Sequence, residues 1–258
     1  MDRGYVLHTY PYRETSLILQ VWTEKHGRLG MVAKGARRPK SAMRAVLVPF
    51  QPLALEWFGR SELKTLKTGE PASPATPLAG PALMSAFYLN ELLLKLTTRE
   101  DPHEGLFAAY DDAITELRAL SRAKPATEPE PGSGGNQGPS PVEPVLRRFE
   151  LRLLQELGYA LELTREAATH APIVAEREYL YVIERGPIPA PEGEAPPNAV
   201  KLRGTTLLDL DRGRLEDAAT IAQAKQLMRL LINHSLNGQE LATRALVRDL
   251  QRLEGEGP

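Results

Sequence analysis

Five short segments within the first 70 residues have the composition of β-strands, and this feature constrains the fold more than any other. Residues typical of turns and loops separate them, among them Gly27, Gly35, Pro39 and Gly59. An open sheet of such strands would leave two exposed edges, which closure into a barrel removes. We therefore predict a five-stranded barrel of the OB type. The expected strands are Tyr5–His8, Thr15–Thr23, Leu29–Ala33, Pro52–Phe58 and Glu62–Thr68.

The rest of the chain predicts mainly helices, because apolar residues recur at a spacing of three and four. The expected fold class is α+β, with an OB-fold barrel domain at residues 1–78 followed by a mostly α-helical domain at 79–258. A weak strand is expected at 176–184. Proline-rich residues 71–81 are expected to connect the two domains. The expected helices lie at about 82–97, 106–120, 142–157, 215–236 and 240–253.

Two segments rich in proline and glycine interrupt the helical part. Residues 123–144 hold six prolines and four glycines among 22 residues. Such a segment cannot bury enough apolar surface to stay ordered, so we expect a flexible linker. A second loop is expected at 186–198, inside a small region of strands and loops at 160–200.

Charge is distributed unevenly along the chain. The 258 residues carry 32 Lys and Arg against 33 Asp and Glu, and the formal net charge of −1 taken alone argues against a nucleic-acid binder. Residues 1–70, however, hold 12 basic and 6 acidic residues, and residues 28–44 hold six basic residues and no acidic one. A basic run of this density is typical of a polyanion-binding patch. The alternative is a solvated loop that keeps the protein soluble.

The barrel segment also carries residue types that bind a nucleic-acid backbone and stack on unpaired bases. Tyr10–Arg13 lies between the first two strands, where OB barrels contact bases. Stacking is equally open to Trp22 and Trp57, for which core packing is at least as good an explanation. The residues expected to contact nucleic acid are Arg13, Arg28, Lys34, Arg37, Arg38, Lys40, Arg44, Lys64 and Lys67.

Arginines on the helix expected at 142–157 indicate a second binding site. Arg147, Arg148 and Arg152 lie beside apolar residues, and Arg148 and Arg152 share one face of the helix. Arginine beside an apolar pocket suits the capture of the C-terminal carboxylate of a partner peptide. The alternative is ordinary charge pairing with Glu150 and Glu156.

No catalytic or cofactor motif is found, so we expect no enzyme, no cofactor and no metal. The five histidines have no metal-ligand spacing, and the chain has no cysteine to ligate zinc. Asp111 and Asp112 are expected to be solvated rather than catalytic. Glu91 lies in a very apolar stretch, so we expect a buried structural anchor there.

No sign of secretion or membrane insertion is found in the sequence. The chain begins without a secretory signal, and no apolar run approaches the ~20 residues that a membrane-spanning helix needs. Together with the lack of cysteine, this favours a cytoplasmic location.

Taken in order, several segments resemble the RecO family of bacterial recombination mediators. The first ones are similar to its early strands and its basic barrel loop, and later ones to its Y-x-N-E-L-L helix and its R-R-F-E and L-G-Y segments. No single motif is decisive, but the ordered set is specific. The segments are Tyr5–His8, Glu14–Leu17, Val32–Arg37, Pro49–Leu53, Leu63–Leu66, Tyr88–Leu93, Leu146–Glu150 and Leu157–Tyr159.

The resemblance implies an OB barrel, a helical domain and no covalent chemistry. It implies binding of single- and double-stranded DNA, annealing of complementary strands, and action with RecR. It also implies binding to the C-terminal tail of single-stranded DNA-binding protein, assistance to RecA, and association with the nucleoid. Some relatives carry a four-cysteine zinc cluster, which this cysteine-free chain cannot form. The rival hypothesis is an adaptor that binds a peptide in a helical groove, with the barrel as a scaffold.

Overall fold

The computed structural model describes residues 1–74, 76–123, 139–159, 161–191, 196 and 198–246. Of these, residues 1–122 and 241–246 belong to one compact unit, and the described residues from 123 to 240 belong to the other. The first unit contains the barrel together with two helices. The expected domain boundary at residue 78 stays a prediction.

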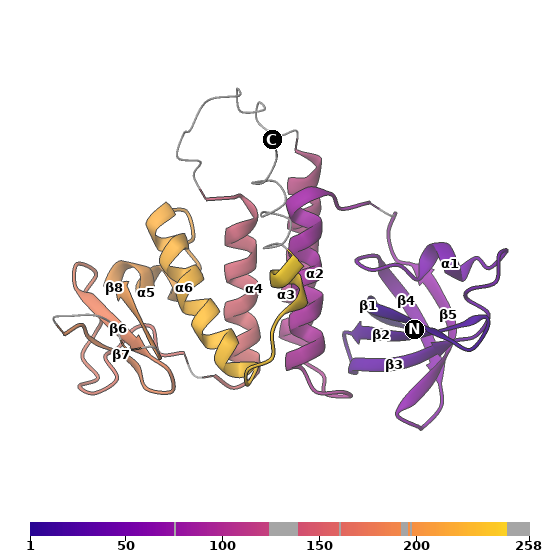
Figure 1. The fold of residues 1–258 in the computed structure, drawn as a ribbon, viewed down its shortest axis with the longest axis horizontal. Coiled ribbons are helices and arrows are strands. Elements are labelled where there is room, and N and C mark those ends of the chain that lie inside the picture. Colours follow the sequence, from indigo (N-terminus) through magenta and orange to yellow (C-terminus); the bar gives the residue numbers. More distant parts are fainter. Residues whose placement is uncertain (75, 124–138, 160, 192–195, 197, 247–258) are drawn as a thin grey trace. The chain divides into compact units, whose positions relative to one another are not determined.

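The first unit begins with a closed five-stranded barrel, which confirms the predicted architecture (Figure 1). The strands follow the order β1-β2-β3-β5-β4 and β4 pairs again with β1. All neighbours are antiparallel except β3 and β5, which are parallel. A short helix, α1, follows β3 and overlaps the end of the basic segment at residues 28–44. The elements are β1 (Asp2–Tyr12), β2 (Ser16–Thr23), β3 (Gly27–Ala33), α1 (Met43–Val46), β4 (Pro52–Phe58) and β5 (Leu63–Pro71).

Alternating apolar residues fill the barrel interior. Because successive side chains of a strand point to opposite faces, every second residue of β2 and β3 turns inward. Leu19 and Val21 of β2 and Leu29 and Met31 of β3 are almost fully buried in this core. The other face of each strand is therefore left for contacts with helices or with solvent.

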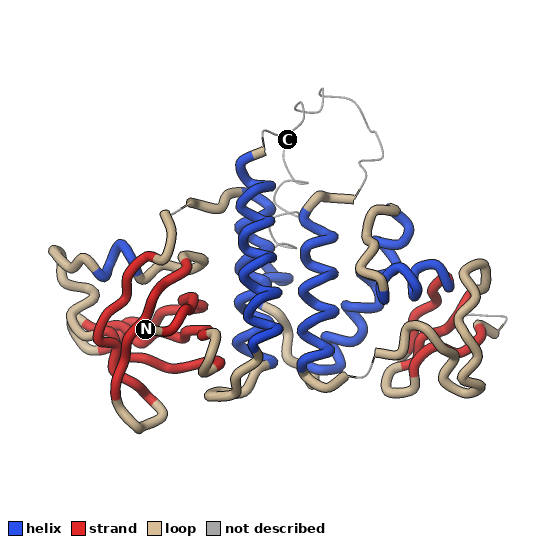
Figure 2. Tube along the Cα trace, turned by 180° about the vertical axis from the view of Figure 1, so that it is seen from behind, coloured by secondary structure: helices blue, strands red, loops and turns tan. Residues whose placement is uncertain are grey.

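Two helices, α2 (Gly80–Leu96) and α3 (Glu104–Arg122), lie side by side and pack on the barrel (Figures 1 and 2). The buried amide of Asn90 on α2 joins three elements. It donates from Nδ2 to the carbonyl of Leu7 on β1 over 2.9 Å, and the hydroxyl of Tyr110 on α3 donates to its Oδ1 over 2.6 Å. At the turn between the two helices, Asp101 approaches Gly27 so closely that a Cβ on Gly27 would lie 2.0 Å from the Asp101 carbonyl oxygen. The expected helices at 82–97 and 106–120 are confirmed.

Glu91 of α2 anchors the C-terminal segment, as expected from its apolar surroundings. Its carboxylate accepts hydrogen bonds from the backbone N–H groups of Ala242 and Thr243, at 2.7 and 2.9 Å, and from the Thr243 hydroxyl at 2.7 Å. Residues 242–246 are helical, so the carboxylate caps the N-terminus of that helical segment. Burial raises the pKa of Glu91, but these hydrogen bonds and nearby Lys95 outweigh it and lower the pKa overall.

The second unit packs helices beside a three-stranded sheet of order β7-β6-β8. The expected helices at 142–157 and 215–236 and the expected strand at 176–184 are confirmed. The expected loop at 186–198 is wrong at its first residues, which pair as β7, and helix α5 was not expected. The elements are α4 (Val142–Glu156), β6 (Glu178–Val182), β7 (Gly186–Pro189), β8 (Ala199–Arg203), α5 (Gly204–Asp211) and α6 (Ala218–Ser235).

Most of the expected linker at 123–144 lies outside the described residues. Its last three residues are already helical, because α4 begins at Val142 and Pro144 falls in the first turn, where proline is tolerated. In the part of the chain that the structure describes, no helix is both long and apolar enough to cross a membrane.

Candidate nucleic-acid interface

The turn between β1 and β2 and the loop after β3 lie together at one end of the barrel. The backbone N–H of Arg37 donates to the carbonyl of Thr15 over 2.9 Å, and its guanidinium lies 3.5 Å from the carbonyl oxygens of Arg13 and Glu14. Ala36 of the same loop is fully buried in the barrel core. The loop is therefore attached to the barrel at both of these points.

Six basic side chains project into solvent from this region, which we call the basic end. All six are exposed, and within the described ranges none of them forms an ion pair with a carboxylate. Six like charges held close together raise the local potential and favour an anionic ligand. The side chains are Arg13, Lys34, Arg37, Arg38, Lys40 and Arg44.

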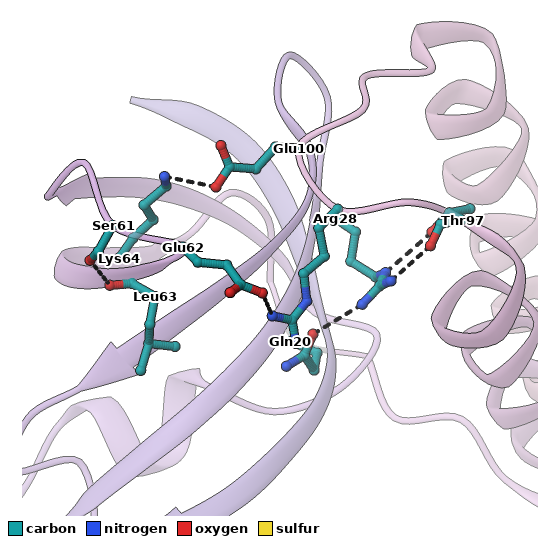
Figure 3. A network of polar contacts seen from close by, with 9 residues as sticks. Gln20, Arg28, Ser61, Glu62, Leu63, Lys64, Thr97 and Glu100 are labelled. Atoms are coloured by element: carbon teal, nitrogen blue, oxygen red, sulfur yellow. Dashed lines mark hydrogen bonds and ion pairs between the residues drawn. The ribbon is translucent and has the colours of Figure 1, made fainter.

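Arg28, one of the residues predicted to contact nucleic acid, makes hydrogen bonds inside the unit (Figure 3). Its guanidinium donates to the carbonyl of Thr97 at the end of α2 over 2.7 Å and to the Gln20 side chain over 3.3 Å. Burial lowers the pKa of Arg28, and the charge of Arg99 lowers it further. The side chain therefore joins β3 to the end of α2.

The two predicted lysines of β5 are also paired with acids. Lys64 is buried, and its Nζ lies 2.8 Å from the Glu100 carboxylate in the turn between α2 and α3 (Figure 3). Lys67 is exposed and pairs with Glu56 of β4 at 2.8 Å. Neither lysine belongs to the basic end.

Helices α2 and α3 cover part of the outer face of the barrel. Trp22 of β2 is fully buried, so core packing holds for it. Tyr5 of β1 has its ring centroid 5.1 Å from that of Tyr110 and donates its hydroxyl to Asp111. Burial raises the pKa of Tyr5 well above its ordinary value, and the hydrogen bond to Asp111 adds to this. The expectation that Asp111 is solvated is wrong, because Arg3 also pairs with its carboxylate at 2.6 Å.

Trp57 lines a small cavity at the opposite end of β3 from the basic end. The cavity has a volume of about 290 Å³ and is also lined by His26, Lys64 and Glu100. The rings of Trp57 and His26 meet edge to face, with centroids 5.2 Å apart. This arrangement leaves no parallel gap between them into which a base could slide.

The arginines of α4 differ from one another. Arg147 is buried, and its Nε lies 2.9 Å from the equally buried carboxylate of Glu150. Arg152 is exposed and pairs with Glu156 at 2.5 Å. Arg147 and Arg152 therefore both form ion pairs within the helix, and the exposed side chains of Arg148 and Arg152 lie on the same face.

Residues 1–75 match the family model described as the recombination protein O N terminal, and residues 136–245 match the corresponding C-terminal model. The chain belongs to the RecO family. The resemblance that the ordered motifs indicated is confirmed, and the N-terminal match coincides with the barrel.

Full-length relatives agree with this assignment. The chain is 47% identical over 252 residues to the DNA repair protein RecO of Azoarcus sp. strain BH72, covering 97% of this chain and 96% of that one. It is 45% identical to the protein of the same name from Aromatoleum aromaticum, with 97% and 95% covered. The corresponding protein of Laribacter hongkongensis is 42% identical, with 98% and 95% covered.

The segment Tyr88–Leu93 has a clear structural role. Asn90 joins α2 to β1 and α3, and Glu91 holds the C-terminal helical segment. Tyr88 lies under the guanidinium of Arg244, 5.6 Å from the ring centroid. In this member of the RecO family the segment therefore connects α2 to β1, to α3 and to the C-terminal helical segment of the first unit.

Proposed function

We propose that this protein is a mediator of DNA repair and homologous recombination that binds DNA at the basic end of its barrel and anneals complementary strands. Membership of the RecO family supports the role in repair and recombination. The observation that carries the binding site is the group of six exposed cations without acidic partners among the described residues. Since such contacts go to phosphates, the site binds single and double strands without reading sequence.

The proposal predicts how steeply the affinity for DNA should fall as the salt concentration rises. Each phosphate neutralised by Lys or Arg releases a counterion, so six contacts to a single strand give a slope of log K against log salt of about −4. Two strands bound at such a site are brought together with their charges screened. This lowers the repulsion that slows pairing of complementary strands.

The partner proteins belong to the same proposal. Acting with RecR, the protein would engage the C-terminal tail of single-stranded DNA-binding protein and help RecA to load. The exposed arginines Arg148 and Arg152 of α4 supply the tail contact, because acidic side chains and a terminal carboxylate accept hydrogen bonds from guanidinium groups. Arg147, buried against Glu150, supports the helix from within and does not touch the tail. No covalent step is involved.

The test compares two variants from which three charges have been removed. Arg37→Ala/Arg38→Ala/Lys40→Ala removes half of the basic end. Its control removes three exposed arginines of the second unit. We expect the first variant to lower the salt slope to about −2 and to slow annealing, and the control to keep both. The control positions are Arg185, Arg212 and Arg214.

The same experiment includes the rival interpretation, an adaptor with an inert barrel. Annealing is measured with two complementary oligonucleotides coated with single-stranded DNA-binding protein, with and without that protein's acidic tail. If the triple variant of the basic end anneals as fast as the unchanged protein, the barrel is a scaffold and the proposed site is wrong. A stimulation that depends on the tail and is lost in Arg148→Ala/Arg152→Ala supports the contact on α4.

A further inference from the structure

One row of paired residues crosses the outer face of the barrel over all five strands. Strand register pairs Tyr10 with Ile18, Ile18 with Val32, Val32 with Thr65, and Thr65 with Phe58. Directly paired residues project from the same face of a sheet, so these five side chains form a continuous line that follows the barrel's curvature. We call it the outer row.

The side chains of the outer row face away from the core. Their neighbours along the strands, such as Leu19, Met31 and Leu66, fill the barrel interior, and alternation turns the row outward. Tyr10 is 47% exposed and Phe58 57% exposed, while the row members between them are partly exposed. The row therefore presents apolar and aromatic surface to solvent, with a large ring at each end.

A second row runs beside the first and ends where the helices begin. It pairs His8, Gln20, Gly30 and Leu63. A Cβ on Gly30 would lie 3.3 Å from the Leu63 side chain, so Leu63 covers the glycine and widens the apolar strip. One step further, Arg28 is tied to the end of α2 by its hydrogen bond to Thr97. The helices therefore limit the open outer face to about two rows.

Positive charge borders the outer row along its other side. Arg13 and Lys34 follow the ends of β1 and β3, just beyond Tyr10 and Val32, and Arg37 is tied to the turn that carries Arg13. An apolar strip with cations along one edge matches a single nucleic-acid strand, which has flat apolar bases on one side and phosphates on the other.

We propose that the outer row is a stacking platform for the bases of single-stranded DNA, with Tyr10 and Phe58 as its two stacking rings. This inference rests on the proposed function and assigns the phosphates and the bases of DNA to two different surfaces of the barrel. The basic end holds phosphates of either single strands or duplex. Only a single strand can lay its bases on the outer row, because the bases of a duplex are already stacked on one another.

The row also predicts the size of the site. It crosses four strand spacings of about 4.8 Å, or about 19 Å along the surface. OB folds bind between about 4 and 16 nucleotides, and a face shortened by α2 and α3 corresponds to the low end of that range. We expect a footprint of about four nucleotides on the barrel.

The test measures the affinity of the full chain for a single-stranded oligothymidine and for a mixed-sequence duplex of equal length, by fluorescence anisotropy. For Tyr10→Ala and Phe58→Ala we expect the single-strand affinity to fall about tenfold each, and the duplex affinity to change less than twofold. The salt slope should stay unchanged, since no phosphate contact is lost. Tyr10→Phe and Phe58→Tyr should retain the affinity of the unchanged protein.

The substitution Phe58→Leu distinguishes stacking on a base from simple apolar contact with it. Phe58→Leu should lose most of the single-strand affinity, because leucine has no ring to stack on a base. Full affinity in Phe58→Leu, equal losses on both DNA forms, or no loss in the alanine variants would each overturn the platform. If the alanine variants bind normally while the triple variant of the basic end is impaired, this inference alone fails. If the unchanged protein binds neither DNA form, the proposed function fails.

Discussion

The barrel carries two sets of basic side chains that have the same chemistry and opposite surroundings. At the basic end, Arg37 and Arg38 project into solvent, and the guanidinium of Arg37 donates to the backbone carbonyls of Arg13 and Glu14. On the side that α2 and α3 cover, Arg28 is tied to Thr97, and Lys64 is paired with Glu100. The first set keeps its charge available for a ligand, whereas the second uses its charge and hydrogen bonds to assemble the fold. In the barrel, position in the sequence alone does not show which positive charges are available to a ligand.

Two adjacent arginines on α4, in the second unit, differ in burial. Arg147 is buried against Glu150, while Arg148 is exposed. Removing one partner of a buried ion pair leaves an uncompensated charge in the interior, at a cost of about 3–5 kcal/mol. We expect Arg147→Ala to lower the free energy of unfolding by that amount and Arg148→Ala to lower it by less than about 1 kcal/mol.

Urea unfolding followed by circular dichroism checks this pair. If both variants lose the same stability, the distinction between the two arginines fails. Arg147→Met is the second measurement. It keeps the aliphatic volume but still removes the guanidinium that pairs with the buried carboxylate of Glu150, so it should remain less stable than the unchanged protein.

A smaller effect is expected for Arg28, which is half-buried and makes hydrogen bonds to Thr97 and Gln20. Hydrogen bonds made by a charged group contribute about 1.5–3 kcal/mol, so Arg28→Ala should lower the free energy of unfolding by about 2 kcal/mol. The salt slope of DNA binding should not change. Arg60→Ala, which removes an exposed arginine of the same barrel, is the control and should leave stability within about 0.5 kcal/mol. A reduced salt slope in Arg28→Ala would show that Arg28 contacts DNA, contrary to this expectation.

The division between the two sets could not be predicted from the sequence, although the barrel could. Strand alternation and turn residues are local signals, and they located the five strands. The partners of Arg28 lie elsewhere: Thr97 is 69 residues away and becomes a neighbour only when α2 packs on the barrel. The basic loop differs because it contains no acid, and its exposed cations pair with no carboxylate in the part of the chain that the structure describes.

The outer row could not be predicted from the sequence for a related reason. Its alignment depends on register, and an irregularity between Glu56 and Trp57 sets the pairing of Phe58 with Thr65. For the arginines of α4, the acid three residues after Arg147 is visible in the sequence. The burial of that pair, however, arises only in the folded unit, where α4 packs among other elements. Local pattern therefore indicated the pairs, and tertiary packing decided which charges remain available.

Glu91 extends the comparison to an acid whose charge is used for assembly. Its pKa is lowered from the ordinary value of 4.5, because its hydrogen bonds to Thr243 and Ala242 outweigh burial. A depressed pKa means that the carboxylate stabilises the folded state above pH about 4.5 and that this contribution is lost as the pH falls through the lower folded value. Loss of such a cap costs about 1 kcal/mol.

Hydrogen exchange of residues 242–246 measures this contribution. We expect protection to decrease as the pH is lowered below about 4.5 in the unchanged protein, after correction for the intrinsic exchange rate. In Glu91→Gln protection should lie, at every pH, near the low level that the unchanged protein reaches in acid, and it should not change further with acid. Asp112→Asn, which alters an exposed carboxylate of α3, should behave as the unchanged protein does. A persistent acid dependence in Glu91→Gln would assign the effect to another group.

The smallest effect, and the one of opposite sign, is expected at the basic end. Six like charges without acidic partners in the described part of the chain repel one another, so removing Arg38 should not destabilise the fold. We expect Arg38→Ala to raise the free energy of unfolding by a few tenths of a kcal/mol, about 0.3, in a buffer of low ionic strength. In ~1 M salt the gain should vanish, because the screening length falls to about 3 Å. If Arg38→Ala is less stable than the unchanged protein at both salt concentrations, the Arg38 side chain helps to hold the fold together. A side chain whose role is to bind a ligand should lose no stabilising contact when it is removed from the free protein.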